Sequence, residues 1–188
     1  MTEPSAFAFP AQWASWLAEH HETSTGLWIK FAKKAAGIQS INHEQALDLA
    51  IAHGWIDGQV KSLDDRYYLQ RFTPRTARSK WSKINCAKAE KLIAAGAMTP
   101  AGLRQVELAK ADGRWDAAYA GPRTIELHPE LQAALDANDA AREFFATLDS
   151  RNRYAIVYRT QDAKKPETRA RRIEKFIAML AAGEKIYP

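Results

Sequence analysis

Apolar residues along this chain recur at two spacings, and the change from one spacing to the other separates an N-terminal part from a C-terminal part. Leu27, Ile29 and Phe31 are separated by single residues, which is typical of a strand with one buried face. Beyond Ser82, apolar residues recur every three or four positions, as in helices that bury one side. The pattern predicts an α+β fold: a small mixed or antiparallel sheet packed by helices, followed by an all-helical C-terminal subdomain.

The ends of two helices are marked in the first part. Pro10 fits a first helical turn, because proline has no backbone N–H to leave unpaired there. Asn42, followed three residues later by Gln45, matches the reciprocal hydrogen bonding of a capping box. Gly54 fits the left-handed conformation that often ends a helix. We therefore expect one helix after Pro10 and another between Asn42 and Gly54.

Two short segments, 55–61 and 66–72, predict an antiparallel hairpin joined through residues 62–65. Side chains alternate between the two faces of a strand, so the register decides which of them are buried. In the second segment one face would carry Tyr68, Gln70 and Phe72, and the other would carry Tyr67, Leu69 and Arg71.

Ser82 is the predicted N-cap of a helix that ends at Gly96. Cys86, Ala89 and Ile93 would share its inward face. We therefore expect the chain's one cysteine to be a small buried residue rather than a nucleophile.

Thr99 followed by proline marks another helix start. Two Gly-Pro or His-Pro pairs make residues 113–129 the best candidate linker. We expect an α+β domain over residues 1–120, carrying the sequences GWIDG, YLQRFTPR and SKWSKIN, and a helical subdomain over 121–188.

Composition and charge narrow the class of protein. The 188 residues include 27 Lys and Arg against 22 Asp and Glu, a net charge of +5. Residues 71–91 hold 7 basic and 1 acidic side chain, and residues 151–188 hold 10 and 4. Two basic blocks of this kind raise the local potential and attract anions.

The sequence disfavours membrane-spanning, secreted, metal-binding and nucleotide-cofactor proteins. No apolar run reaches the roughly 20 residues of a membrane span, and the start has neither the basic nor the apolar region of a secretory leader. A single cysteine fits a reducing compartment, so we expect a cytoplasmic protein. Five histidines without paired-ligand spacing predict no metal site, and the absence of glycine-rich nucleotide motifs predicts no cofactor.

The segment from residue 73 to residue 82 has the composition of an anion site. A strand ends just before it and a helix begins just after it, so unpaired backbone N–H groups would point at a ligand. Arginines supply planar donors that fit phosphate or carboxylate. The alternative is a solvated loop whose arginines pair with Asp57, Asp64 and Asp65 of the hairpin.

In the predicted site, arginines neutralise charge, hydroxyl groups donate hydrogen bonds, tryptophans form the walls, and Asp57 orients an arginine. The ligand-binding set is Trp55, Asp57, Tyr68, Arg71, Thr73, Arg75, Arg78, Ser79, Trp81, Ser82 and Asn85. A desolvated Asp57 would instead act as a general base in an enzyme. A third alternative is nucleic-acid binding by the basic blocks 71–91 and 151–175, where aromatic and basic residues interleave.

Several motifs resemble those of the YdeI/OmpD-associated family, often labelled bacteriocin-protection. They are Gly54-Trp-Ile-Asp-Gly58, Asp64-x-x-x-Tyr68-Leu-Gln-Arg-Phe-Thr-Pro-Arg75, Ser79-x-Trp81-Ser-Lys-Ile-Asn85 and Met98-Thr-Pro-Ala-Gly102. The resemblance runs from about residue 28 to residue 115, and more loosely from about 129 to 183. It implies a role in stress or antimicrobial tolerance. It supplies no established reaction and no catalytic residues.

Overall fold

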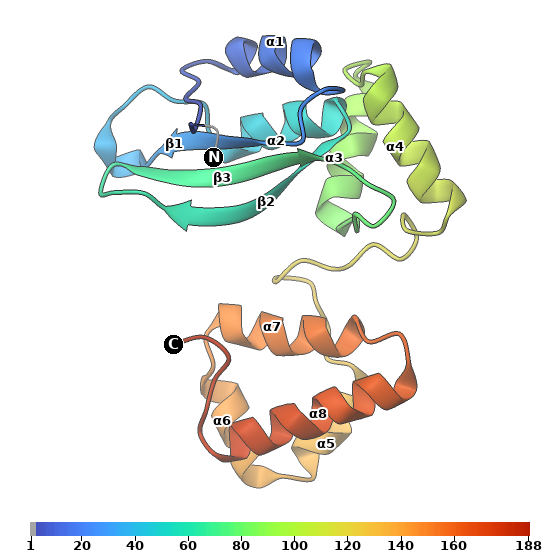
Figure 1. Ribbon diagram of the computed structural model, residues 1–188. Coiled ribbons are helices and arrows are strands. Elements are labelled where there is room, and N and C mark those ends of the chain that lie inside the picture. Colours follow the sequence, from blue (N-terminus) through green and yellow to red (C-terminus); the bar gives the residue numbers. More distant parts are fainter. Residues whose placement is uncertain (1–2) are drawn as a thin grey trace. The chain divides into compact units, whose positions relative to one another are not determined.

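The computed structural model describes residues 3–188, which form two compact units (Figure 1). Unit 1 ends at Ala118, and unit 2 begins at Tyr119. Unit 1 combines a three-stranded antiparallel sheet with helices, and unit 2 contains helices only, so the predicted α+β class is confirmed. No helix in the described part of the chain is long and apolar enough to cross a bilayer.

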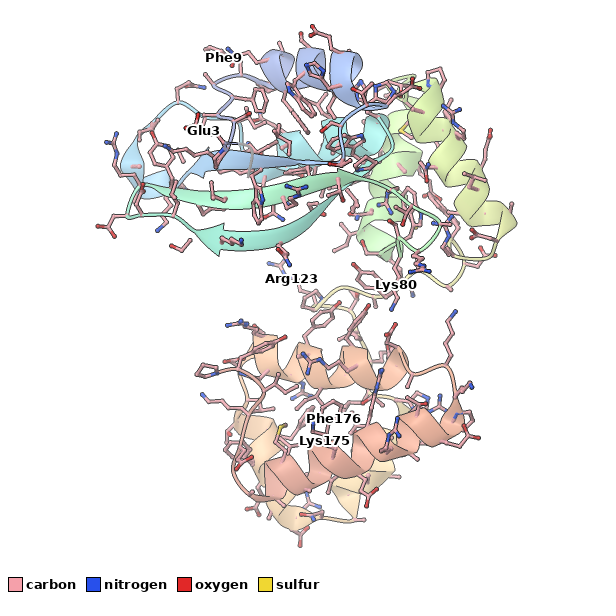
Figure 2. The ribbon with its side chains drawn as sticks, in the orientation of Figure 1. Glu3, Phe9, Lys80, Arg123, Lys175 and Phe176 are labelled. Atoms are coloured by element: carbon pink, nitrogen blue, oxygen red, sulfur yellow. The ribbon has the colours of Figure 1, made fainter. Side chains whose placement is uncertain are left out.

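Unit 1 begins with a helix and a strand. Phe9, which is 56% exposed, directly precedes α1 (Figure 2). Helix α1 opens with its proline at the first position, as predicted. The elements of unit 1 are α1 (Pro10–His20), β1 (Leu27–Ala32), the short 3-10 helix η1 (Lys34–Ala36), α2 (His43–Ala52), β2 (Trp55–Ser62), β3 (Tyr67–Pro74), α3 (Lys83–Ala94) and α4 (Pro100–Ala111).

The predicted hairpin forms β2 and β3, which pair antiparallel from Trp55 opposite Pro74 to Ser62 opposite Tyr68. The pairing is irregular between Asp57 and Val60, where a bulge shifts the register. Strand β1 pairs with the other side of β3, so the order in the sheet is β1-β3-β2. The strand that is last in sequence is therefore central in the sheet.

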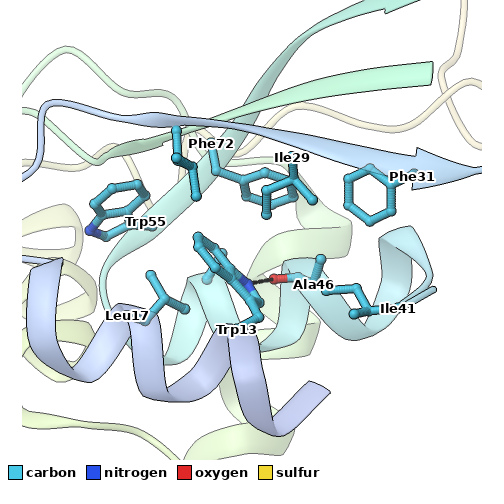
Figure 3. Close-up of a cluster of buried hydrophobic side chains, with 10 residues drawn as sticks. Trp13, Leu17, Ile29, Phe31, Ile41, Ala46, Trp55 and Phe72 are labelled. Atoms are coloured by element: carbon cyan, nitrogen blue, oxygen red, sulfur yellow. Dashed lines mark hydrogen bonds between the residues drawn. The ribbon is translucent and has the colours of Figure 1, made fainter. Parts of the chain in front are cut away.

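One face of this sheet packs on α1 and α2 (Figure 3). Trp13 of α1 is fully buried, and its indole Nε1 donates to the Ala46 carbonyl oxygen of α2 at 3.1 Å. Trp55 and Phe72 reach the same core from the sheet. A buried indole keeps its polar hydrogen satisfied in this way while contributing a large apolar surface. The bond therefore ties the two helices together beneath the sheet.

The predicted helix starts are confirmed by their side-chain caps. The Asn42 side chain accepts from the Gln45 backbone N–H at 2.9 Å, and Ser82 Oγ accepts from the Asn85 N–H at 3.1 Å. Thr99 caps α4 in the same manner. Gly54 has a φ of 76°, the left-handed conformation that glycine adopts without strain.

A second apolar cluster joins α2 to α3 and α4 and includes Trp81 and Cys86. Cys86 is buried, as expected, and burial raises the pKa of its thiol, which keeps the thiol protonated and unreactive. Ile93 was expected on the same face but is 38% exposed. It lies in the last turn of α3, close to the Gly96 that ends the helix.

Unit 2 is built from four helices around one apolar core. Among the described residues, no helix or strand lies between Ala111 and Pro129, and Trp115 and Ala118 at the start of this segment pack on the second apolar cluster of unit 1. The helices are α5 (Pro129–Asp136), α6 (Asp139–Thr147), α7 (Ser150–Gln161) and α8 (Pro166–Ala181). The side chain of Asn152, fully buried, exchanges two hydrogen bonds with the backbone of Tyr187 and so holds the chain's end against α7.

Candidate functional site

The loop at residues 73–82 is held in place by hydrogen bonds within the loop and from Arg114. The Thr76 N–H donates to Ser79 Oγ at 2.9 Å, which closes a tight turn. Arg114 then donates to the carbonyl oxygen of Ser79 at 3.0 Å, while its Nε lies 2.8 Å from the carboxylate of Asp112. Ser79, which the anion hypothesis assigned to a ligand, is therefore engaged in fixing the loop.

Arg75 is the most deeply buried of the predicted arginines, with 5% of its surface exposed. Its guanidinium carbon lies 3.5 Å from the centre of the Trp81 ring, and its Nη1 donates to the Lys80 carbonyl oxygen at 3.2 Å. Its backbone N–H bonds to the Gly54 carbonyl oxygen at 2.9 Å. A desolvated guanidinium on an indole face is a strong stabilising contact. The geometry gives Arg75 a structural part in this loop.

The other two predicted arginines, Arg71 and Arg78, lie away from the Trp81 ring that Arg75 contacts. Arg71 is on the face of β3 opposite to the core, with its guanidinium 5.8 Å from the centre of the Trp28 ring. Arg78 is exposed, and its backbone N–H bonds to Thr76 Oγ1 at 3.2 Å. Thr73 is partly exposed, one position after the core residue Phe72. The three guanidinium groups do not converge on one pocket.

The remaining predicted residues are mostly structural in this arrangement. Ser82 caps α3, and Asn85 is buried one turn along it. Tyr68 stacks on Phe31 with 5.3 Å between ring centres, and burial raises the pKa of its phenol. Trp55 is 1% exposed within the core.

Asp57 contacts a histidine rather than an arginine. Its Oδ2 lies 2.9 Å from Nε2 of His43, the first residue of α2. Both side chains are partly exposed, at 26% and 40%. A carboxylate in this position fixes the orientation of the imidazole. The sequence did not indicate this pair, because the two residues are brought together only when β2 crosses the start of α2.

A cavity of about 300 Å³ opens beside the predicted loop, entirely within unit 1. It lies where the ends of α1, α2 and β3 and the beginnings of β2 and α4 meet. Of the predicted ligand set it includes only Trp55 and Arg75. Its lining is His21, Glu22, His53, Gly54, Trp55, Pro74, Arg75, Ala101, Arg104 and Gln105.

Two histidines of the cavity are held in the same way. His21 and His53 each place Nδ1 2.9 Å from a carbonyl oxygen one turn earlier, in α1 and α2 respectively. A carbonyl oxygen only accepts, so each Nδ1 carries the hydrogen and each Nε2 is left for another partner. The two ring centres are 5.6 Å apart. Burial, the largest cause, lowers the pKa of His53 below its ordinary value, so this imidazole is neutral at pH 7.

Helix α4 brings an arginine to the same cavity because two glycines let it pack closely. A Cβ on Gly54 would lie 3.0 Å from the Ala101 carbonyl oxygen, and one on Gly102 would overlap the Ala52 carbonyl oxygen. Arg104, one half-turn farther on, is exposed, and among residues 3–188 its guanidinium has no hydrogen bond or ion pair. Neither Arg104 nor the two histidines could be found from the sequence, because Gly54 and Gly102 are far apart in the chain and meet only in the fold.

The cavity combines a cationic group with imidazole nitrogens, a set suited to an anion. Glu22 Oε1 lies 3.8 Å from Nε2 of His21 and is 72% exposed. Among the described residues, no group of three metal-ligating side chains is arranged to hold an ion. The cavity therefore offers a ligand a guanidinium and two imidazole Nε2 atoms, which become hydrogen-bond donors when the rings are protonated.

Comparison with known families gives two matches. Residues 5–105 match a family described as a domain of unknown function, DUF8412, and residues 124–183 match the family described as Bacteriocin-protection, YdeI or OmpD-Associated. The family suggested by the motifs is thus confirmed, although its match covers the helical part. All four motifs lie within the other match, over residues 5–105.

No curated protein and no solved structure has a significant match to this chain. The first family match covers more than half of the residues, and the second lies within unit 2. The chain therefore belongs to the DUF8412 family, and it carries in addition a domain of the YdeI/OmpD-associated bacteriocin-protection family.

Proposed function

We propose that unit 1 binds a small anion, of the sulfate, phosphate or carboxylate class, in the cavity beside Trp55. The observation that carries the proposal is the pair His21 and His53, whose Nδ1 atoms are both committed to backbone carbonyls beside Arg104. This arrangement leaves two Nε2 atoms and one guanidinium for a ligand. We therefore propose the adjoining cavity as the anion site, in place of the loop at residues 71–85 that the sequence suggested.

Electrostatics favours an anion over a neutral ligand. Arg104 carries a permanent positive charge, and the buried guanidinium of Arg75 adds to the local potential. Protonation turns an imidazole Nε2 from an acceptor into a donor, so a histidine next to a bound anion gains both a charge and a hydrogen bond. The negative charge of Glu22 is mostly exposed and is screened by water.

Proton uptake should accompany binding. Burial lowers the pKa of His53, and a bound anion would raise that pKa again by stabilising the imidazolium. Linkage then requires that the affinity for the anion increases as the pH falls through the range in which His53 takes up its proton. Sulfate is the best probe, because its own charge stays constant over this range.

The experiment is a calorimetric titration of the full chain with sulfate at constant ionic strength, at pH 8 and pH 6. We expect tighter binding at pH 6, with net proton uptake seen as a dependence of the heat on buffer ionisation. Arg104→Ala should weaken binding about tenfold, the usual loss for one charge-assisted hydrogen bond. Arg78→Ala removes an exposed arginine of the originally predicted loop and serves as the matched control.

The two variants distinguish the sites. Weak binding by Arg78→Ala together with normal binding by Arg104→Ala would place the anion at the loop and refute the cavity. Equal sulfate affinities at pH 8 and pH 6 would show that the histidines do not take part in binding the anion.

For the biological setting we propose a cytoplasmic role in stress or antimicrobial tolerance, in line with the bacteriocin-protection description of the family matched by residues 124–183. The test is survival of a deletion strain under bacteriocin challenge, complemented with the wild-type chain or with Arg104→Ala. Full complementation by this variant would separate the tolerance role from anion binding. No change in survival on deletion would refute the tolerance role.

A further inference from the structure

The sheet of unit 1 has a second face, and within the described part of unit 1 no helix packs on it (Figure 1). Helices α1 and α2 cover the face that carries Ile29, Phe31 and Phe72. The alternating residues of β1 and β3 therefore point the other way and are partly exposed. This cationic–aromatic face consists of Trp28, Lys30, Lys61, Arg66, Tyr67 and Arg71.

Each aromatic ring of this face has two cations near it. Lys61 Nζ lies 4.7 Å, and the Arg71 guanidinium carbon 5.8 Å, from the centre of the Trp28 ring. At the other end of the sheet Lys30 Nζ lies 4.0 Å, and the Arg66 guanidinium carbon 5.8 Å, from the centre of the Tyr67 ring.

The strands contribute no opposing charge to this face. Strands β1 and β3 contain no acidic residue, and the carboxylate of Asp57 in β2 is bonded to His43 on the core side. At the end of the hairpin, Asp64 Oδ1 accepts the backbone N–H groups of Arg66 and Tyr67 and so belongs to the turn. The face is complementary to a polyanion that also presents flat apolar groups.

The spacing of the rings favours unpaired bases. In the sheet register Trp28 lies opposite Arg71, and Tyr67 lies four residues away, opposite Ala32. Four residues of strand correspond to about 13 Å, several times the roughly 3.4 Å between stacked bases on one strand of a duplex. An extended single strand with separated bases can place a base on each ring while its phosphates follow the cations.

We propose that the cationic–aromatic face binds single-stranded nucleic acid, with bases stacked on Trp28 and Tyr67 and phosphates held by Lys30, Lys61, Arg66 and Arg71. The long lysine side chains would move from the ring faces to the phosphates as the bases stack. Of the residues on this surface, only Arg71 belongs to the basic blocks 71–91 and 151–175 that the sequence suggested for nucleic acid. The surface is also independent of the anion cavity.

The experiment measures fluorescence anisotropy of a labelled mixed-sequence dodecamer, as RNA and as DNA, titrated with the full chain at several KCl concentrations. Trp28→Ala combined with Tyr67→Ala should weaken binding at least about tenfold without changing the salt dependence, because stacking is not ionic. Lys30→Ala combined with Lys61→Ala should reduce the slope of log affinity against log salt by about 1.4, or about 0.7 for each lost phosphate contact.

Matched controls lie away from this face. Lys83→Ala with Lys91→Ala removes two exposed lysines of α3, and Phe9→Ala removes an exposed aromatic ring. Both should bind as the wild type does, and Arg104→Ala should also leave nucleic-acid binding unchanged, which separates this proposal from the anion cavity. Circular dichroism verifies that each variant is folded.

Three outcomes would overturn the proposal. The first is no binding of either single strand at low salt. The second is wild-type affinity in the folded double variant of Trp28 and Tyr67. The third is equal affinity for the single strand and its duplex, which would indicate attraction to phosphate alone. If the aromatic variant does not fold, the charge reversals Lys30→Glu and Lys61→Glu test the same face, and unchanged binding by that variant also refutes it.

Discussion

Replacing Gly102 with alanine tests how α4 is held against α2. In an ordinary helix this change stabilises by about 1 kcal/mol, because alanine has the higher helix propensity. Here the new Cβ would overlap the Ala52 carbonyl oxygen and lie 2.8 Å from both the Ala52 carbonyl carbon and Met98 Cε. The same Ala52 oxygen accepts the Thr99 N–H at 3.0 Å and the Thr99 hydroxyl at 2.8 Å.

The overlap with a backbone carbonyl cannot be relieved by a side-chain rotation, so α4 must move away from α2. Overpacking of this kind costs about 1–3 kcal/mol, and each weakened hydrogen bond of Thr99 adds up to about 1 kcal/mol. Set against the gain in propensity, we expect Gly102→Ala to lower the free energy of unfolding by about 2 kcal/mol. Movement of α4 would also displace Arg104 and weaken sulfate binding.

Urea unfolding followed by circular dichroism measures the change in free energy. Leu103→Ala, at a neighbouring position that is 37% exposed, provides a control in the same helix and should change stability far less. A stabilised Gly102→Ala variant, as expected for an unconstrained helical glycine, would refute the close approach of α4 and α2. It would also refute the position assigned to Arg104 at the cavity.

Two further predictions concern Arg75 and His53. Arg75→Ala should lower the free energy of unfolding by about 2 kcal/mol or more in urea titrations, because a desolvated cation–π contact with Trp81 is lost. Unchanged stability would contradict this structural role and favour the ligand-binding role that the sequence suggested for Arg75. For His53 the lowered pKa means that the unfolded chain binds more protons, so stability should fall as the pH drops below about 6.5. Urea unfolding at several pH values should show a shallower fall for His53→Gln, and an identical fall would contradict the burial of the imidazole.

Local signals in the sequence were sufficient for most of the secondary structure. The caps at Asn42, Ser82 and Thr99 are satisfied by side chains within three residues, and the hairpin joins neighbouring segments. Interactions of such short range depend little on the rest of the fold. The position of β1 beside β3, by contrast, follows from pairing residues about forty positions apart, and no local pattern encodes that choice.

The arrangement of the predicted site residues in space could not be predicted from the sequence. Arg71, Arg75 and Arg78 are close in sequence, yet one lies on the outer sheet face, one is buried on Trp81 and one is exposed. A strand alternates its side chains between two faces, so closeness in sequence does not bring charged groups together. The histidines of the cavity show the converse, because residues 32 positions apart meet where two helices end.

By itself, then, the sequence determined which segments are helices and strands, where most of them begin, and that the chain combines a small sheet with a helical C-terminal part. Those features rest on backbone geometry and on hydrogen bonds between near neighbours. Tertiary structure decided the strand order, the pairing of Asp57 with His43, the cavity beside Trp55 and the open face around Trp28. Each of these depends on long-range packing, in which burial of the common core fixes the side of every element that remains available for binding.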